Sequence, residues 1–525
     1  MILLASIGGI QDFLFDVREE GGGQARSLRH RSFRIQLLAE CVAIRLLEAA
    51  GLARDKLLFC AAAKVAIDAT GITTEALDAV RSAVADLESR LLNETHGRLR
   101  LAFAAQDSAD TFATTVQRAE RALRRSKLRA YAPHGDSEPW NLGSLTLDHP
   151  WDASTEAEMD AEFGRELATA KWLSINRDEG ELDPLGSPCL GLRVRLSQDV
   201  PRNWPTLISC SNLVSPETRP AGIHGSLFHP RTLARHIPRD ERGNPIEFVS
   251  LAQRSRGAPM LGVLKADVDS LGVAASAAIA RGGAASLRNF SEGLDRFFSQ
   301  TLEAEKNRAD SPWSNIYTVF SGGDDILAVG PWDLMIDFAG HMQTLFSKQF
   351  GTGALNSPSS VPLTLCAAVA IIKPRYPVHI AAHQAEELLS QAKTKCADGV
   401  AMPKDQCAAF GDLWKWKDHA RIINDGKKLA DWVDAGIVQR GWLQTILELA
   451  LLQCGEAGPE YENIPPATAG YKLAYHIARN WPSSGPARMW IDQVAKKFES
   501  QSRHFQTIVR YAMLATRGKN SGEEQ

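Results

Sequence analysis

Closely spaced cysteines are missing from this sequence. Eight cysteines are scattered over 525 residues, and no two of them form a C-x-x-C pair. The knuckles of a zinc ribbon need thiolates at that spacing, so we expect no zinc site of this kind. Isolated cysteines in a chain of this length are typical of reduced, mostly buried thiols, which predicts a cytoplasmic protein.

Membrane and export signals are missing as well. No apolar run approaches the roughly 20 residues that cross a bilayer, so we expect no membrane contact. The apolar N-terminus has no positively charged region and reaches Gln11 and Asp12 too early for a signal peptide. The formal net charge is only −3, so no overall basic excess indicates a polyanionic partner, although this average hides local basic faces.

Apolar periodicity divides the chain into four zones, because 525 residues are too many for one hydrophobic core. Residues 1–145 predict the ferredoxin-like order β-α-β-β-α-β, with strands at 2–7, within 57–67 (a pair) and at 98–104, and helices at 32–50, 74–92 and 111–125. Residues 246–415 repeat this plan, with strands at 261–266, 316–320, 326–329 and 363–372, and helices at 286–305, 333–350 and 380–394. The repeat indicates duplication of one unit.

The two remaining zones differ in character. Residues 146–245 are rich in Pro, Gly, Asp and Trp, which predicts an irregular linker domain with a few strands, such as 171–175 and 191–196. Residues 416–525 are helical, and the surrounding helical spacing favours a core role over base stacking for Trp414, Trp416, Trp432 and Trp442. The predicted fold class is therefore α+β, with two ferredoxin-like domains, a linker domain between them and a C-terminal helical domain.

The sequence Gly322-Gly323-Asp324-Asp325 lies between two apolar strands. Two consecutive glycines permit positive φ at both central positions of a tight hairpin, and they let a nucleotide phosphate approach the backbone. Adjacent carboxylates repel each other unless a cation joins them, which favours a Mg²⁺ or Mn²⁺ site. A Gly-Gly turn followed by acidic residues is also ordinary turn chemistry, so a purely structural role stays open for this motif alone.

A second acidic element supports the metal site. Asp267 comes at the end of the apolar strand 261–266, and alternation places Asp267 and Asp269 on the same side. In the predicted fold this strand is central and lies beside the hairpin, so we expect Asp267 to face Asp324 or Asp325. Carboxylates from two neighbouring strands are the arrangement that metal-assisted phosphoryl transfer uses.

A cation should also reach the triphosphate of a bound nucleotide. Lys393 at the end of the predicted helix 380–394 is our first candidate, and Lys395 is the second. The alternative for Lys393 is a solvated lysine that the helix dipole favours at a C-terminus.

Several motifs together resemble the large subunit of type III CRISPR effector complexes, the Cas-ten family in its Csm-type branch. The resemblance runs through nearly the whole chain, at residues 6–13, 28–33, 261–272, 317–332, 385–393, 473–475 and 479–480. The Gly-Gly-Asp-Asp turn alone is shared with diguanylate cyclases and some polymerases, but its combination with the N-terminal motifs is far more specific.

The resemblance implies two facing palm domains of the cyclase and polymerase type, each holding one ATP. The second palm would form 3′-5′ linkages and close them into cyclic oligoadenylate when target RNA is bound. It implies Asp267, Asp324 and Asp325 as catalytic metal ligands, and as nucleotide contacts Ser270, Ser321, Gly322, Gly323 and Lys393. The implied partners are the guide-RNA-bearing effector subunits (a small helical subunit, a repeat-handle-binding subunit and backbone subunits) and target RNA.

The sequence departs from the family pattern in three ways. Many members begin with an HD-type nuclease, but this sequence contains no His-Asp dipeptide, so we expect no DNase of that kind. The linker has no zinc-binding cysteine pairs. Cys366 replaces a serine that is common after the turn. In the first palm, the place of the turn reads Cys60-Ala61-Ala62-Ala63-Lys64 without a carboxylate, so we expect that palm to bind nucleotide but not to catalyse.

Two basic clusters favour contact with RNA or a partner subunit over a purely solvated face, because arginine suits bidentate phosphate contacts. Their members are Arg26, Arg29, Arg31 and Arg34 in one cluster, and Arg118, Arg121, Arg124, Arg125, Lys127 and Arg129 in the other.

Two rival functions stay open. A stand-alone synthase of cyclic dinucleotides from GTP would need two chains to bring two half-sites together, whereas here both palms lie on one chain. A non-catalytic scaffold of the ribonucleoprotein would not need intact carboxylates at the turn.

Overall fold

The computed structural model describes most of the chain. The residues that it describes are 1–15, 24–61, 63–109, 111–128, 163–167, 169–177, 187–201, 205–214, 217–229, 234, 236–351, 362–397, 400–458 and 464–518. In the described part, no helix is long and apolar enough to cross a membrane.

The N-terminal domain is a ferredoxin-like sheet, as the sequence predicts. Its strands are β1 (Ile2–Gly8), β2 (Leu57–Ala61), β3 (Lys64–Asp68) and β4 (Arg100–Gln106), in the order β2-β3-β1-β4. Two long helices pack on one face, α2 (Gln24–Ala49) and α3 (Thr74–Glu94), while α4 (Phe112–Leu128) covers the other. The short helix α1 (Ile10–Phe15) follows β1.

The second sheet repeats this plan and extends it. Its strands follow the order β10-β11-β9-β12-β13-β14, with bounds β9 (Leu261–Val268), β10 (Tyr317–Gly322), β11 (Asp325–Pro331), β12 (Leu365–Ile372), β13 (Gln406–Ala409) and β14 (Asp412–Lys415). Helices α7 (Leu271–Arg296) and α9 (Trp332–Phe350) cover one face, and α10 (Val378–Thr394) covers the other. The sequence did not predict β13 and β14, because four-residue strands are too short to show a period.

Two predicted helix starts are wrong. The first long helix begins at Gln24 and not at residue 32, which the sequence did not show because residues 24–32 contain only one large apolar side chain, Leu28, and so have no period. The helix expected to begin at residue 286 begins at Leu271, directly after β9, and the chain departs from helical geometry at Gly282 and Gly283. These two glycines interrupt the apolar periodicity, which is why the pattern hid the first half of α7. The helix continues through a π-helical turn at Phe297–Thr301 into α8 (Leu302–Asn307).

The linker is more regular than predicted. Its strands form an antiparallel sheet in the order β6-β7-β5-β8, with bounds β5 (Trp172–Arg177), β6 (Ser187–Cys189), β7 (Leu192–Ser197) and β8 (Leu207–Asn212). One face of this sheet joins the core of the first palm through Leu173, Ile175 and Val194. Short elements complete the connections, namely η1 (Arg54–Lys56), η3 (Gly225–Leu227), α6 (Phe248–Ala252) and η5 (Pro312–Asn315).

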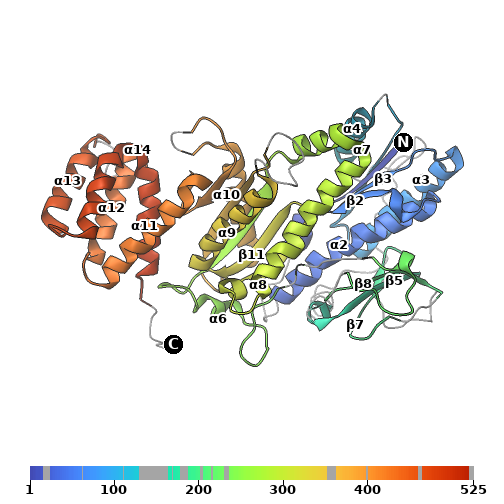
Figure 1. Cartoon of the computed structure of the whole chain (residues 1–525), viewed down its shortest axis with the longest axis horizontal. Helices are drawn as coiled ribbons and strands as arrows, with labels where there is room; N and C mark the ends of the chain where they lie inside the picture. Colours follow the sequence, from blue (N-terminus) through green and yellow to red (C-terminus); the bar gives the residue numbers. More distant parts are fainter. Residues whose placement is uncertain are drawn as a thin grey trace.

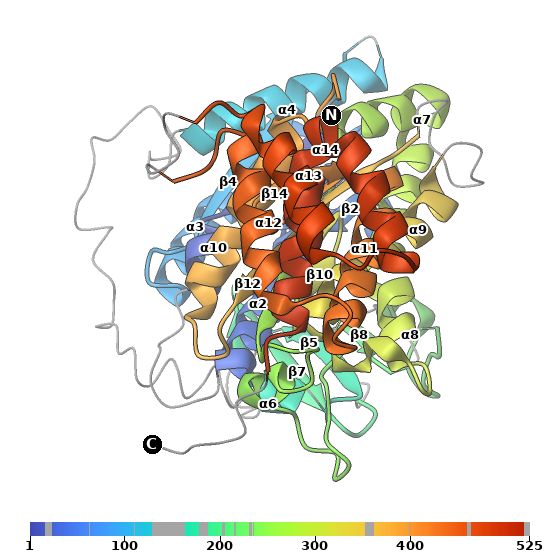
Figure 2. The ribbon, with the colours of Figure 1, turned by 90° about the vertical axis from the view of Figure 1, so that its left-hand side faces the viewer.

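The C-terminal domain is helical, as predicted. It consists of α11 (Trp416–Asp434), α12 (Arg440–Gln453), α13 (Thr468–Asn480) and α14 (Pro486–Ala515), which lie in front of the palm sheets in Figure 2. Trp414 and Trp416 are buried, and Trp432 and Trp442 pack against the same core. The core interpretation of these four tryptophans is therefore confirmed.

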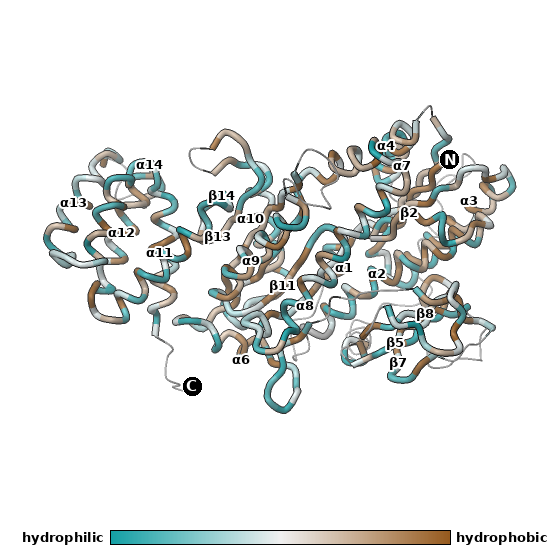
Figure 3. Tube along the Cα trace, in the orientation of Figure 1, coloured by the Kyte–Doolittle hydropathy of each residue, from teal (hydrophilic) through white to brown (hydrophobic). Residues whose placement is uncertain are grey.

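The two palms are packed directly together. Helix α2 of the first palm lies along β10 of the second, and α7 reaches across to β2 and α4 (Figure 1). A single hydrophobic core contains Leu38 and Val65 of the first palm together with Val263 and Leu327 of the second. Hydrophobic segments such as β11 run through the interior, whereas hydrophilic segments alternate with hydrophobic ones along the helices (Figure 3).

Part of one basic cluster belongs to this contact rather than to an outer surface. The guanidinium of Arg29 is buried and donates to the carbonyl of Gly164 (2.8 Å) and to the hydroxyl of Tyr317 in β10 (2.6 Å). Arg31 is buried too and donates to the carbonyl of Phe13 (3.0 Å). The prediction of an RNA-contacting face is therefore wrong for Arg29 and Arg31, because burial keeps both away from any large ligand. The side chain of Arg26 and all of Arg129 lie outside the described residues.

Candidate active site

The strand register places the Gly-Gly-Asp-Asp turn one residue further along than the sequence suggested. Gly322 is the last residue of β10 and pairs with Asp325, so the two central residues are Gly323 and Asp324. Only Gly323 has positive φ, at 67°. The prediction of positive φ at both glycines is wrong, because Gly322 still belongs to the ladder. Glycine at the first central position alone is typical of a type II′ turn.

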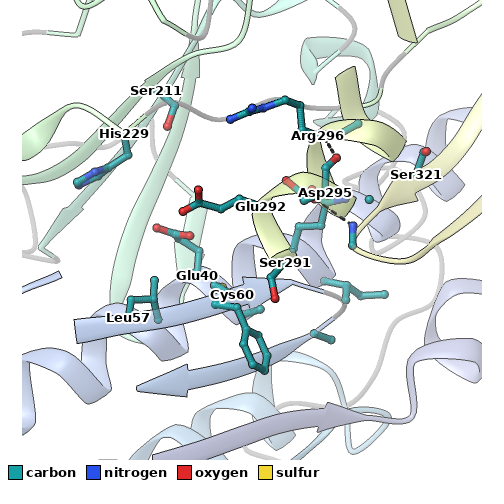
Figure 4. Close-up of a pocket in the computed structure, with 18 of the residues that line it drawn as sticks. Glu40, Leu57, Cys60, Ser211, His229, Ser291, Glu292, Asp295, Arg296 and Ser321 are labelled. Carbon is teal, nitrogen blue, oxygen red and sulfur yellow. Dashed lines mark hydrogen bonds between the residues drawn. The ribbon is translucent and has the colours of Figure 1, made fainter. Parts of the chain in front are cut away.

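Helix α7 holds this turn in place. The carboxylate Oδ1 of Asp295 accepts a hydrogen bond from the backbone N–H of Gly323 at 3.0 Å, which Figure 4 shows as a dashed line. Two residues before Gly323, the buried hydroxyl of Ser321 donates to the carbonyl of Phe298 at 2.7 Å. Sequence reasoning missed Asp295, because a helical residue 28 positions before its partner carries no local signal.

Asp267 lies directly opposite the turn. It pairs with Asp325 across the β9–β11 ladder, so the expectation that the first strand runs beside the hairpin is confirmed. Lys393 on α10 forms an ion pair with Asp267, with 2.6 Å between Nζ and Oδ1. Lys393 is thus engaged with the carboxylate site and is not the fully solvated lysine of the alternative interpretation.

The two residues after β9, Asp269 and Ser270, form hydrogen bonds with neighbouring loops. Asp269 is buried, and its Oδ2 accepts hydrogen bonds from the hydroxyl of Thr364 (2.8 Å) and the backbone N–H of Asp405 (2.9 Å). Ser270 is exposed, and its hydroxyl accepts a hydrogen bond from Nζ of Lys404 at 2.8 Å. Cys366 of β12 is the register partner of Asp267 in β9. Its buried thiol donates a hydrogen bond to the carbonyl oxygen of Ala392 at 3.5 Å.

Burial dominates the electrostatics of the three carboxyl groups. It raises the pKa of Asp267 to about 6, an effect that the nearby charge of Lys393 partly offsets. Burial also raises the pKa of Asp324, against the charges of Lys64 and Lys393. The pKa of Asp325 is raised well above its ordinary value by burial and by the charges of Asp324 and Asp267. Because these three carboxyl groups lie close together, their negative charges repel one another. A cation is needed between them if all three are to be ionised.

A second ion pair lies two residues earlier in β9. Lys265 pairs with Glu386 of α10, and both charges act on the pKa of Asp325. The ion pairs Lys265–Glu386 and Lys393–Asp267 therefore flank the carboxylates along the same helix. Sequence reasoning did not select Lys265 or Glu386.

The donor atoms suit a hard divalent cation, although no preassembled ligand set is present. Oδ1 of Asp325 is buried and has no hydrogen-bond partner among the described residues. Carboxylate oxygens are the ligands that Mg²⁺ and Mn²⁺ prefer. Within the described ranges, however, no group of three or more His, Cys, Asp and Glu side chains is arranged to hold a metal ion. Asp267 instead pairs with Lys393.

A cavity of about 1090 Å³ opens between the two palms and the linker. Its walls include four of the predicted site residues, which are Ser321, Gly322, Gly323 and Asp325, but not Asp267, Ser270, Asp324 or Lys393. The remaining walls carry charges of both signs, as Figure 4 shows for Glu40, Glu292 and Arg296. His229 of the linker lies at the opposite wall, and burial lowers its pKa to about 4.

Comparison with known families agrees with this geometry. Residues 260–401 match the family model of the Cas10/Cmr2 second palm domain, and residues 1–138 match that of Csm1 subunit domain B. The chain belongs to the Cas10/Csm1 family. The first match contains the paired carboxylates of β9 and β11, and the second contains the first ferredoxin-like sheet.

Curated Cas10/Csm1 relatives extend the similarity along the chain. The chain is 26% identical over 497 residues to the single-strand-specific deoxyribonuclease Cas10/Csm1 (subtype III-A) of Mycobacterium tuberculosis, covering 84% of this chain and 58% of that protein. It is 24% identical over 439 residues to the protein of the same name from Streptococcus thermophilus, covering 76% and 53%. The chain therefore spans between about half and six tenths of the length of these relatives.

Solved Csm1 structures share the fold. The crystal structure of a Csm1-Csm4 cassette in complex with AMPPNP matches with a TM-score of 0.73 at 20% identity, covering 98% of this chain and 69% of that one. A Csm1-Csm4 cassette in complex with cA4 matches with a TM-score of 0.72 at 19% identity, covering 98% and 70%. At 19–20% identity, this likeness shows that the chain shares the fold of these structures.

Proposed function

We propose that this chain synthesises cyclic oligoadenylate from ATP at the Gly-Gly-Asp-Asp turn, as the large subunit of a type III CRISPR effector complex. Target RNA held by the complex would activate the reaction, in the cytoplasm. The chemical step is a nucleotidyl transfer in which the 3′-oxygen of one nucleotide attacks the α-phosphorus of another. The bond to the bridging oxygen then breaks, and pyrophosphate leaves.

The register between β9 and β11 carries this proposal. Asp267 and Asp325 are direct partners, and Asp324 precedes Asp325 in the turn, so three carboxyl groups come from two neighbouring strands and the adjoining turn. They lie at the edge of a cavity large enough for nucleotides, with Gly322 and Gly323 in its wall. A turn without side chains at these two positions lets a phosphate approach the backbone closely.

In this proposal Asp267, Asp324 and Asp325 hold one or two Mg²⁺ or Mn²⁺ ions. A bound ion would lower the pKa of the attacking 3′-hydroxyl and neutralise the triphosphate. The side chains themselves do the positioning: Asp295 fixes the N–H of Gly323, and Lys393 is shared between Asp267 and the incoming triphosphate. Ser270 and Ser321 are proposed as further nucleotide contacts, Ser321 through the lone pairs that its bond to Phe298 leaves free.

Two of the similar solved structures support the same substrate and product. The structural neighbours are described in complexes with AMPPNP and with cA4. Both are Csm1-Csm4 cassettes, which supports an effector-subunit partner for this chain as well. The DNase activity in the names of the curated relatives is not part of our proposal, since these 525 residues contain no His-Asp dipeptide.

The proposal is tested with the assembled effector complex. Guide RNA, matched target RNA, Mg²⁺ and labelled ATP or GTP are supplied, and products are resolved by chromatography. We expect cyclic oligoadenylate from ATP only when target RNA is present, and none from the Asp324→Asn/Asp325→Asn double variant.

The rival functions give different results in this assay. Product from GTP by the isolated chain would replace our proposal with a stand-alone cyclic dinucleotide synthase. Failure of the intact complex to make any product from ATP, with assembly unaffected by the double variant, would indicate a scaffold.

A further inference from the structure

Lys393 places a positive charge directly on one of the carboxyl groups that are proposed to hold metal ions. Its Nζ is 2.6 Å from Oδ1 of Asp267, so the ammonium group takes an oxygen that a divalent cation would need. Its charge also acts on Asp324, where it opposes the rise in pKa that burial causes. One lysine therefore compensates two of the three carboxyl groups.

This contact follows from the way helix α10 lies along strand β9. Glu386 and Lys393 are seven residues apart in α10, about two helical turns, so both lie on one side of the helix. Glu386 pairs with Lys265, and Lys393 pairs with Asp267 two residues later on the same face of β9. The register of the helix on the strand thus brings Lys393 to Asp267.

The backbone at the end of α10 is held independently of this ion pair. Gln406 of β13 donates from Nε2 to the carbonyl oxygens of Ala392 (2.7 Å) and Lys395 (2.6 Å), on either side of Lys393. Gln406 and Ala392 are both buried. The ion pair can therefore break by rotation of the lysine side chain, with the helix end left in place.

The lysine side chain can exchange partners at little cost. The side chains of Lys393 and Asp267 are each 30% exposed, so water reaches both. A partly solvated ion pair of this kind contributes only about 1 kcal/mol or less to stability. Lys265, by contrast, is 14% exposed and is held deeper in the sheet by Glu386.

We propose that Lys393 is an internal competitor of the divalent cation. Its ammonium group holds the Asp267 oxygen in the nucleotide-free chain and leaves it when a polyphosphate offers the lysine another anionic partner. This inference rests on the proposed function, which supplies both the cation and the polyphosphate. A divalent cation at the same oxygen is repelled by the ammonium group, so the chain binds metal weakly until the lysine has moved.

The competition determines how the site fills. Polyphosphate draws Lys393 away from Asp267 and so favours the metal, and metal on Asp267 frees the lysine and so favours polyphosphate. Such coupling is reciprocal, since each ligand changes the affinity for the other by the same factor. The complete site then assembles only around substrate, and Lys393 is a competitor in the empty site and a substrate contact in the filled one.

The first test measures Mn²⁺ binding to the full chain at pH 8 without nucleotide, from the electron paramagnetic resonance signal of free Mn²⁺. We expect Lys393→Gln to bind Mn²⁺ about tenfold more tightly than the wild type, because the competing cation is gone. This gain should disappear in Asp267→Asn/Lys393→Gln. The exposed Lys395 is the matched control, and Lys395→Gln should bind as the wild type does.

A second control separates direct competition from a general effect of charge. The charge of Lys64 also acts on Asp324, but among the described residues Lys64 forms no ion pair with Asp267. Lys64→Gln should therefore tighten Mn²⁺ binding much less than Lys393→Gln does.

The second test measures the binding of inorganic tripolyphosphate by calorimetry, in EDTA and at saturating Mn²⁺. Direct contact between Mn²⁺ and phosphate strengthens binding in every chain. In the wild type Mn²⁺ also releases Lys393, so the ratio of the two dissociation constants should be larger for the wild type than for Lys393→Gln. An equal ratio in the two chains overturns the exchange of partners.

The outcomes separate this inference from the proposed function. Unchanged Mn²⁺ affinity in Lys393→Gln, or an equal gain in Lys64→Gln, overturns the competition even if the complex makes oligoadenylate. Tighter Mn²⁺ binding in Lys393→Gln alone, combined with no oligoadenylate synthesis by the wild-type complex, supports the competition and overturns the proposed function. Circular dichroism of the variants verifies that they fold, so that the affinities report on the site.

Discussion

Nζ of Lys393 lies 2.6 Å from Oδ1 of Asp267, which joins the end of helix α10 to the central strand β9. Each of the two side chains is only 30% exposed. The lysine therefore compensates the charge of a carboxylate that lies next to Asp324 and Asp325, and in the proposed reaction it would also contact the triphosphate.

Replacement of Lys393 should impair catalysis strongly. We expect Lys393→Gln to lower oligoadenylate synthesis by about 10- to 100-fold, since it removes a charged contact to substrate and the partner of Asp267. Lys395→Gln is the matched control, because Lys395 is exposed two residues further along and has no such contact with Asp267. Equal losses in both variants would refute the assignment of Lys393.

Synthesis should depend on pH through Asp267. Burial raises the pKa of this carboxyl to about 6, and only the ionised form can hold a divalent cation. Activity should therefore fall about tenfold per pH unit as the pH drops below that value. In Lys393→Gln the offsetting charge is gone, so the midpoint should move to higher pH. A profile measured from pH 5 to 8 with saturating Mg²⁺ checks both expectations, and an unchanged midpoint would contradict the second.

Neutralising Asp325 should stabilise the fold while it abolishes activity. A carboxyl whose pKa is higher in the folded than in the unfolded chain adds stability below its unfolded pKa and loses this contribution as pH rises through its folded pKa. At pH 8 and without metal, we expect Asp325→Asn to raise the free energy of unfolding by about 1–2 kcal/mol. Denaturant unfolding in EDTA measures this change. The exposed Asp310→Asn should alter neither stability nor activity, and a destabilised Asp325→Asn would show that the carboxylate is compensated in some other way.

Asp295 should act by positioning the turn. Asp295→Ala removes the acceptor of the Gly323 N–H, so we expect kcat to fall about tenfold with little change in KM for ATP. Asp295→Asn keeps an acceptor oxygen at the same place and should restore most of the rate. Steady-state kinetics of the wild type, Asp295→Ala and Asp295→Asn measures kcat and KM for each. Equal activity of the alanine and asparagine variants would exclude the positioning role.

The two glycines of the turn should respond differently to alanine. Gly323 has φ of 67°, which costs a side chain about 1–2 kcal/mol, so Gly323→Ala should destabilise the chain by that amount. Gly322 has ordinary strand geometry, and a Cβ there would lie 3.4 Å from Oδ1 of Asp295, so Gly322→Ala should cost less than about 0.5 kcal/mol. Thermal unfolding of the two variants compares them, and a larger loss for Gly322→Ala would contradict the register.

Much of the fold could be predicted from the sequence because its signals are local. The continuous apolar runs of β9 and β11, the turn after Gly322 and the helical period of α9 and α10 all depend on residues close in the chain. The boundaries failed where the local pattern was interrupted, as in α7 at Gly282 and Gly283, or where strands were short, as in β13.

The sequence by itself determined the carboxylates of the site. Asp267, Asp324 and Asp325 could be named because a strand end and a glycine turn are recognisable without any distant contact, and the register then confirmed that Asp267 and Asp325 are neighbours.

Only the tertiary structure decided which residues surround those carboxylates, hold the turn in place and compensate their charge. Asp295 reaches Gly323 from a helix, Arg29 turns inward to Tyr317, and the charge of Lys64 in the other palm acts on the pKa of Asp324. These partners are separated by tens to hundreds of residues in the chain, and no local period or turn preference records such contacts. They are set by how the two palms pack: burial of apolar faces in a shared core drives this packing, and the charged residues come together as a consequence.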